Sequence, residues 1–413
     1  MFSGKVFRER LMLLSKERKP FYLLGSMFFF WALFDGLIAY ILPVLITSRG
    51  FSATEMGLII GSSNIFGMLF DFVLVRYLKS TNYRRLFLVV YLLCFAYPIF
   101  LWFSKEIGLF LVSMSVWGLY GDFNNFAAYD FLSRHSKLEN HCKDAGVIEM
   151  TRGFGYLVAP MIAGILVVKS VDFFPISLSI SFLMISLIFY ILLMGTKKKE
   201  ESEVFSHKAH KYNFWKEIFL MNKIGKLLMP VLFFNILMHI FDSIFWTIGP
   251  IYSQNFPNFE DFGGLFLTAY NLPFLSFLWL APLISKKIGK KRTAYLSLIT
   301  GCLIIIPISF FHQPLVILTL IFLAAIAFSQ AWPSVRGTFT DYIAESPSYE
   351  KEIETLNDFS SNIGYTIGPI VAGLMVDTIG YKNLFATIAI VGISIALLLL
   401  FVTPRNIKVV VHR

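Results

Sequence analysis

Charged residues are scarce in this chain. Asp, Glu, Lys and Arg together make up 15% of its 413 residues, whereas about 25% is usual in soluble proteins. A soluble chain of this length folds into two or three domains, each of which needs a charged surface. Hydrophobic residues reach 56% and leave too little polar material for such surfaces. The composition therefore excludes an ordinary soluble enzyme, a disordered chain and a coiled coil, and it predicts a protein that crosses a membrane many times.

Cysteine and catalytic motifs are scarce as well. The three cysteines, Cys94, Cys142 and Cys302, have neither metal-ligand spacing nor the pattern of a disulfide framework. The sequence also lacks a phosphate-binding loop, a His-Glu-x-x-His motif and a serine nucleophile elbow. We therefore expect no enzymatic activity, no metal and no cofactor. The absence of any Asn-x-Ser/Thr acceptor favours a bacterial inner membrane.

Long apolar runs, by contrast, fill most of the chain. A membrane-spanning helix needs roughly 20 apolar residues, and these runs are too long for the strands of a membrane barrel. The first run is too long for a signal peptide and has no cleavage site of small residues, so we expect it to be retained. The sequence thus predicts twelve spanning helices, at 20–47, 55–78, 85–103, 107–133, 146–169, 173–195, 228–254, 262–285, 292–311, 314–343, 355–378 and 382–403.

Basic residues concentrate in alternate connections between these helices. Thirty of the 36 Lys and Arg residues lie in the two tails and in the loops of the same side, and four lie in the opposite loops. The other two, Arg152 and Arg336, lie within helices. The positive-inside rule then places both termini in the cytoplasm. Because the basic residues flank apolar spans and form no continuous stripe, we expect no binding of nucleic acid.

The two halves of the sequence repeat each other. Asp35 is followed eight residues later by Pro43, and Asp242 is followed by Pro250 in the same way. The repeat predicts two six-helix bundles of the same orientation, at 1–195 and 228–413, joined by a cytoplasmic loop at 196–227. This loop contains an amphipathic run from Phe214 onward, which we expect on the membrane surface.

A stripe of small residues recurs in the predicted 146–169 and 355–378 helices. Small residues spaced by four let helices approach closely, and a proline allows a bend. With the duplication, this stripe resembles the antiporter motif of the major facilitator superfamily, with Ala at two Gly positions, and the resemblance extends over essentially the whole chain. The stripe serves either export by antiport, as the resemblance implies, or helix packing only. Its residues are Gly146, Gly155, Ala159, Pro160, Ala163 and Gly164 in the first copy, and Gly364, Gly368, Pro369 and Gly373 in the second.

The loop after the predicted 55–78 helix resembles the gating motif of the same family. Gly67 and Asp71 match it and Arg76 keeps a basic charge, while Leu74 replaces the expected turn glycine. The second copy of this loop has Lys286 where the acid belongs. The resemblance therefore makes the first copy the candidate for a charge-locked gate.

Three carboxylates are candidates for proton coupling: Asp35, Asp242 and Asp122. Asp35 and Asp242 lie near the middle of their predicted helices, where a charge costs roughly 2.5–3.5 kcal/mol on insertion scales. Such residues either bind protons or substrate, or they pair structurally with backbone and amide groups. Asp122 is open to both interpretations equally.

Polar and aromatic residues share faces of the predicted helices that contain these acids. In the resembled fold such helices line a central cavity. Arg336 either faces this cavity as the partner of an anion or pairs with Asp341, and Arg152 either forms a local salt bridge with Glu149 or has a functional role. His239 either titrates or is a hydrogen-bonded packing residue. The candidate cavity residues are Trp31, Trp117, Asn125, Tyr129, His239, Trp246, Trp332 and Arg336.

The sequence thus predicts an all-α membrane protein with the major facilitator fold and both termini in the cytoplasm. The resemblance implies a secondary transporter of a small organic solute that works by alternating access. We expect a monomer in membrane lipid that couples the movement of the solute to protons, and the stripe favours export by antiport. The predicted 107–133 helix lacks the Arg of the family's drug antiporters, so symport of a sugar or another polar solute is an alternative. A receptor or scaffold that does not transport is an alternative from another class.

Overall fold

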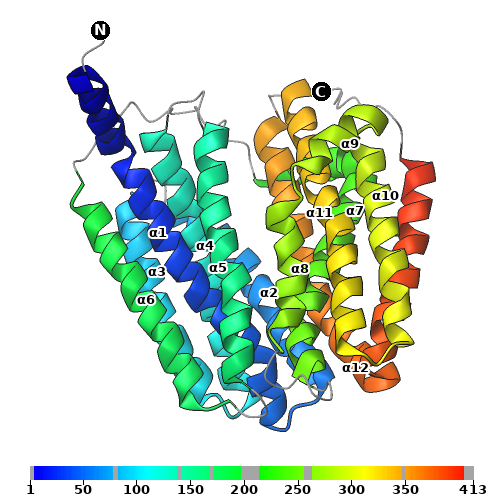
Figure 1. Ribbon diagram of the computed structural model, residues 1–413. Coiled ribbons are helices and arrows are strands. Elements are labelled where there is room, and N and C mark those ends of the chain that lie inside the picture. The colour runs from blue at the N-terminus through cyan, green and yellow to red at the C-terminus, as the bar shows by residue number, and fades with distance from the viewer. Residues whose placement is uncertain are drawn as a thin grey trace.

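The structure, a computed structural model, describes residues 4–77, 82–136, 141–167, 171–196, 214–254, 263–346 and 349–403. Every regular element in these ranges is a helix, as predicted (Figure 1). The helices are α1 Gly4–Ser48, α2 Ala53–Tyr77, α3 Tyr83–Phe103, α4 Ile107–His135, α5 His141–Leu166, α6 Phe173–Met194, α7 Phe214–Gln254, α8 Leu265–Ser276, α9 Leu280–Ile288, α10 Lys290–Ile305, η3 Ile306–Ser309, α11 Pro314–Glu345 and α12 Glu350–Val402.

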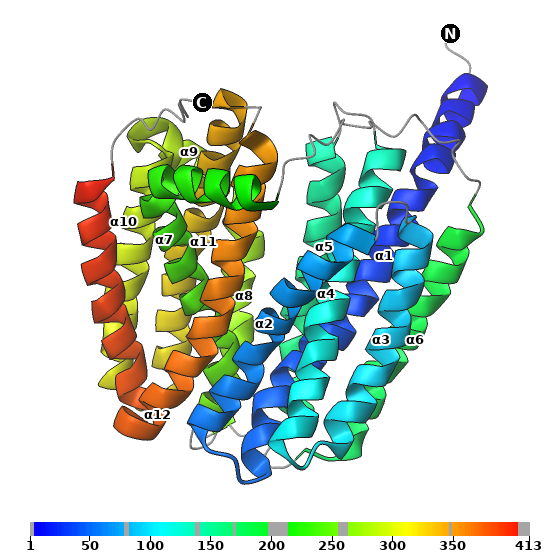
Figure 2. The same ribbon diagram turned by 180° about the vertical axis from the view of Figure 1, so that it is seen from behind.

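The helices form two bundles that lie side by side. Figures 1 and 2 show α1–α6 in one bundle and α7–α12 in the other, with the beginning of α1 and the end of α12 on the same side of the molecule. We call this the terminal side and its opposite the far side. The most apolar stretch of α1 is 83% buried, whereas those of α6 and α12 are 33% buried. Helix α1 is therefore central, and α6 and α12 leave much of their surface toward lipid.

The lengths of the helices suit a membrane. Among the described residues, eight helices are individually long and apolar enough to cross one, and the bent pair of α8 and α9 supplies a ninth span. Helix α12 covers two predicted spans. The chain turns between them at Gly380, where φ is +79°. Helices α4 and α5 carry charged side chains and run beside the others (Figure 1).

Three helices differ from the sequence prediction, and the first is α1, which begins at Gly4 instead of at residue 20. The predicted 262–285 helix is broken, because α8 and α9 meet at an angle of 65° around Phe277. Helix α7 begins at Phe214, well before the predicted start at 228. Figure 2 shows its first turns lying across the terminal side of the second bundle. Most of the predicted central loop, from 197 to 213, lies outside the described residues.

The small-residue stripes hold α5 against α1 and α12 against α7. A Cβ atom on Gly155 would lie 2.6 Å from the Cβ of Ala32, and one on Gly36 would lie 2.9 Å from the Cβ of Ala159. In the second bundle a Cβ on Gly364 would lie 2.5 Å from the Cβ of His239. These distances leave no room for larger side chains, so the glycines permit the close approach of the two helices.

Further along, the same stripes join the two bundles. Gly164 and Pro160 of α5 contact Gly264 at the start of α8, where an added Cβ would lie 1.8 Å from the Pro160 carbonyl oxygen. The repeat-related contact is between α12 and α2, where a Cβ on Gly57 would lie 2.1 Å from the carbonyl oxygen of Pro369. Both contacts lie on the far side, because α2 and α8 begin there (Figure 1). The bundles are thus sealed on the far side by backbone against backbone.

A carboxylate adds to this seal. Asp377 of α12 accepts hydrogen bonds from the backbone N–H groups of Ala53 (3.2 Å) and Thr54 (2.8 Å) and from the Thr54 hydroxyl (2.6 Å). These are the first residues of α2, so the acid of one bundle caps a helix of the other, where negative charge is favourable. Gln254 at the end of α7 donates to the Val167 carbonyl of the first bundle at 2.9 Å.

Candidate functional site

A cavity of about 660 Å³ lies between the two bundles. Helices α1, α2, α4 and α5 contribute to its wall from one bundle, and α7, α8, α11 and α12 contribute from the other. Aromatic rings, amides and carboxylates alternate on this wall, as a site for a polar organic molecule requires. Its polar and aromatic residues include Trp31, Asp35, Asn64, Trp117, Asp122, Asn125, Glu149, Arg152, Tyr156, Asp242, Trp246, Asn271, Trp332, Asn362 and Tyr365.

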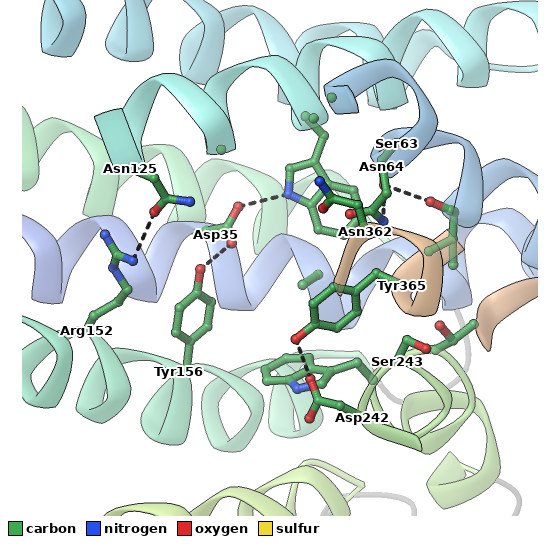
Figure 3. A pocket seen from close by; sticks show the side chains of 18 of the residues that line it. Asp35, Ser63, Asn64, Asn125, Arg152, Tyr156, Asp242, Ser243, Asn362 and Tyr365 are labelled. Carbon is green, nitrogen blue, oxygen red and sulfur yellow. Dashed lines mark hydrogen bonds between the residues drawn. The ribbon is translucent and has the colours of Figure 1, made fainter. Parts of the chain in front are cut away.

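Asp35 of α1 is surrounded by hydrogen-bond donors. The Tyr120 hydroxyl (2.5 Å) and the Trp117 indole N–H (3.2 Å) donate to its Oδ1 atom, and the Tyr156 hydroxyl donates to Oδ2 at 2.7 Å. Figure 3 shows Tyr156 reaching Asp35 across the cavity wall. Only 6% of the residue is exposed. Three neutral donors from two other helices therefore fix a buried carboxyl group.

Asp242 of α7 has a related environment. The Tyr270 hydroxyl of α8 donates to Oδ1 at 2.8 Å, and the Tyr365 hydroxyl of α12 donates to Oδ2 at 2.9 Å (Figure 3). Tyr365 directly follows a stripe glycine, Gly364, just as Tyr156 follows Gly155. The close helix contact at each glycine thus brings the next residue, a tyrosine, within reach of the carboxylate. None of the ion pairs within the described residues includes either acid.

Among the described residues that line the cavity, Arg152 of α5 is the one with a basic side chain. Its Nη1 atom lies 3.4 Å from Oε1 of Glu149 and donates to Oδ1 of Asn125 at 3.3 Å, which confirms the expected local ion pair. The guanidinium carbon lies 4.5 Å from the ring centre of Phe28 and 5.8 Å from that of Trp31. The Nε and Nη2 atoms are buried and have no hydrogen-bond partner among the described residues.

Three predicted cavity residues lie off the wall. His239 packs behind it, with its ring 4.6 Å from Trp332 and 4.8 Å from Tyr365, and its Nδ1 atom lies 2.7 Å from the Asn235 carbonyl oxygen. Tyr129 and Arg336 are exposed outside the wall. Asp341 forms its ion pair with Lys290, at 2.7 Å. The other candidates lie on the wall: Trp31, Trp117, Asn125, Trp246 and Trp332, together with Asp35, Asp122 and Asp242.

The gate and the first end of the stripe are described only in part. Gly67 lies on the cavity wall, and a Cβ atom added to it would lie 2.8 Å from Oδ2 of Asp122. The side chains of Asp71 and Arg76 lie outside the described part of the chain. A Cβ on Gly146 would meet no heavy atom within 4 Å, so this first glycine of the stripe contacts no neighbouring helix here.

The sequence interpretation missed the tyrosines that bind the two acids. Tyr156 and Tyr365 occupy equivalent places in the repeat, and this equivalence was the signal that could have identified them. The same holds for Asn64 of α2 and Asn271 of α8, which share the spacing of the repeat and both lie on the cavity wall. Among the described residues, no group of three His, Cys, Asp or Glu side chains could hold a metal ion.

Known proteins share the sequence pattern and the fold. The family model of the Major Facilitator Superfamily matches residues 24–349. The nucleoside transporter NupG has a TM-score of 0.72 at 12% identity, over 94% of this chain and 100% of that one. The peptide transporter POT in complex with sulfate has a TM-score of 0.73 at 12% identity, over 94% of both chains.

A third solved structure is a bacterial homolog of the human lysosomal transporter Spinster in an inward-facing and unoccupied conformation. Its TM-score is 0.72 at 11% identity, over 94% of this chain and 95% of that chain. At these identities the likeness shows the fold alone. No curated protein sequence matches the chain.

Proposed function

The chain belongs to the Major Facilitator Superfamily and is a multi-pass membrane transporter, and we propose that it moves a small organic solute by alternating access, coupled to protons at Asp35 and Asp242. The observation that carries this proposal is the pair of repeat-related carboxylates in the cavity, each bound by tyrosine hydroxyls and neither in an ion pair with a described residue. Ionisable groups at this depth mark proton and substrate pathways.

The far-side seal supports a mechanism in which the bundles rock about the cavity. Both seals between the bundles are repeat-related, so the symmetric arrangement on the terminal side is a natural second state. With the termini in the cytoplasm, as the positive-inside rule expects, the sealed far side is extracellular and this conformation is open to the cytoplasm. We propose that the membrane in which the protein lies is a bacterial inner membrane.

The contacts of the small-residue stripe are compatible with export and with uptake, so the proposal covers both directions of transport. In α5 and in α12 the stripe makes the same two kinds of contact, first within its own bundle and then with the other one. These contacts support a role of the stripe in sealing the two bundles against each other. Export by antiport and uptake by symport both need such a seal. Because one chain supplies the whole cavity wall, we propose that a monomer in lipid transports the solute.

The test is a proton-flux screen of the purified protein in proteoliposomes. Vesicles loaded with a pH-sensitive dye are exposed in turn to sugars, amino acids, organic acids and lipophilic cations. We expect at least one class to evoke a pH change with the wild-type chain and with Asp172→Asn, which alters an exposed acid before α6. Asp35→Asn and Asp242→Asn should abolish the change. A protein that moves neither solute nor protons would instead be a receptor or scaffold.

A further inference from the structure

Most charged groups of the cavity wall already have partners. Asp35 accepts three hydrogen bonds and Asp242 accepts two. Glu149 pairs with Arg152, although its side chain is 55% exposed and this pair is open to solvent. Asp35, Asp242 and Glu149 therefore do not depend on a ligand for their contacts.

Arg152 is different, because its guanidinium group is only partly used. A guanidinium carries five N–H donors in a planar fork. Only Nη1 is engaged, with Asn125 and Glu149, while Nε and Nη2 have no partner among the described residues. These two nitrogens share the edge that binds a carboxylate or phosphate through two parallel hydrogen bonds. Buried donors left unpaired cost free energy, and an anion would satisfy both at once.

From these contacts we propose that Arg152 binds the anionic group of the solute, so that the substrate is a small organic oxyanion with a flat apolar body. The class includes carboxylates and phosphate esters, which present the same pair of oxygen atoms to the fork. The inference rests on the proposed function and names the substrate class of its cavity. The edge is closed to water here, so the long Arg152 side chain must turn toward the cavity when the anion binds.

Aromatic side chains near Arg152 are the reason why we propose a solute with a flat apolar body. The rings of Phe28 and Trp31 lie against the guanidinium and hold its plane. Across the cavity, Trp246 of the second bundle contacts Tyr156 of the first, with ring centres 6.0 Å apart. A flat body attached to the anion can lie against the rings of Trp31, Tyr156 and Trp246, which line the cavity, and thus touch both bundles.

The position of Arg152 also ties the anion to the proton site. Arg152 precedes Tyr156 by one turn of α5, and Tyr156 donates to Asp35. The Arg152 charge therefore lies one turn of α5 from the donor that holds the Asp35 carboxyl group. An anion on Arg152 would offset that charge and so change the field at the carboxyl group, which links solute binding to protonation without a direct contact.

A matched set of ligands tests the proposal on the purified full chain. The probes are 3-phenylpropionate, its neutral amide, the corresponding amine, and phenyl phosphate, and binding is measured by tryptophan fluorescence and thermal stabilisation. We expect the carboxylate and the phosphate to bind at least roughly tenfold more tightly than the amide and the amine. Arg152→Gln should remove this preference, and Arg152→Lys should keep part of it, because lysine retains the charge without the fork.

Arg292→Gln is the matched control, because it removes an exposed arginine at the start of α10. It should bind all four probes like the wild type, and the melting temperatures of the ligand-free variants check that each one folds. The proposal is overturned if the acid binds no better than its amide, if Arg152→Gln keeps the preference, or if no oxyanion binds below about 10 mM. Proton flux evoked by sugars or cations alone would leave the transporter proposal standing and reject only the oxyanion.

Discussion

At the scale of residues, neutral hydrogen-bond donors stabilise the two buried carboxyl groups of Asp35 and Asp242. A buried carboxyl group without partners costs several kcal/mol, and the three donors on Asp35 and two on Asp242 offset that cost. Because phenol hydroxyls are neutral, the carboxyl group that they bind can be either protonated or ionised. An arginine in their place would hold the acid permanently ionised.

The tyrosine contacts lead to a direct prediction. Tyr156→Phe and Tyr365→Phe each remove one donor from a buried acid, and each should lower the free energy of unfolding by about 1 kcal/mol and alter the pH dependence of transport. The control is Tyr91→Phe, which removes a buried hydrogen bond of 2.6 Å to Ser186 away from the cavity. It should melt at a similarly lowered temperature with an unchanged pH profile. Equal pH profiles in all three variants would make the tyrosines merely structural.

Sequence reasoning could identify the acids but not their partners. A carboxylate in the middle of an apolar run stands out from composition alone, and Asp35 and Asp242 share the spacing of the repeat. Tyrosines are common in membrane helices, and which one reaches an acid depends on how two helices rotate against each other. The sequence also could not show the two unpaired nitrogens of Arg152, because the spacing to Glu149 predicts one ion pair and carries no information about Nε and Nη2.

At the scale of elements, the stripes of α5 and α12 combine two kinds of contact. Gly155 and Gly364 pack against the first helix of their own bundle, and Gly164 and Gly373 meet the other bundle. The two glycines of each helix are nine residues apart and lie on opposite sides of it, so a single helix connects the carboxylate site with the far-side seal. A rotation of α5 or α12 moves both together, as coupled gating requires.

Gly155→Ala tests the packing contact. The new methyl group would lie 2.6 Å from both the Ala32 Cβ and the Phe29 carbonyl oxygen, so α1 and α5 must separate, at a cost of about 1–3 kcal/mol. We expect a lower melting temperature and the loss of transport. Gly146→Ala lies on the same stripe in open space and should behave like the wild type. Equal stability of the two variants would contradict the contact.

The limits of span prediction follow from what hydropathy measures. An apolar window reports that a segment can lie in lipid, but it carries no information about direction, so the 65° bend between α8 and α9 was invisible. The turn at Gly380, by contrast, lies between two apolar runs, so the sequence predicted two spans where α12 turns. The early start of α7 coincides with the amphipathic run from Phe214 onward, and the sequence separated this run from the 228–254 span because its polar residues interrupt the apolar pattern.

At the scale of the whole molecule, the far-side seal stabilises the conformation described above, which is one of the two states of the proposed alternating-access mechanism. Backbone contacts at Gly57 and Gly264 and the Asp377 cap on α2 hold this state together. The cap is exposed to solvent, so its strength is modest. Removing it should shift the equilibrium between the two states rather than abolish one of them.

Asp377→Ala tests that shift. A single cysteine is introduced at Ala39 on the cavity wall, after Cys142 has been replaced by serine, and it is labelled from outside the cell with an impermeant maleimide. We expect Asp377→Ala to raise the labelling rate severalfold, because the far side opens more often. Glu106→Ala, at the start of α4 within the first bundle, is the control and should leave the rate unchanged. An unchanged rate in Asp377→Ala would mean that the cap does not hold the seal.

The central claim is that Asp35 and Asp242 couple solute movement to protons, and one comparison tests it most directly. In proteoliposomes with an imposed pH gradient, accumulation of the solute found by the flux screen is measured beside counterflow at equal concentrations on both sides. The account predicts that Asp35→Asn and Asp242→Asn lose accumulation and keep counterflow, since exchange needs no net proton transfer. If both variants accumulate solute with the wild-type pH dependence, the two carboxylates are structural and the coupling site lies elsewhere.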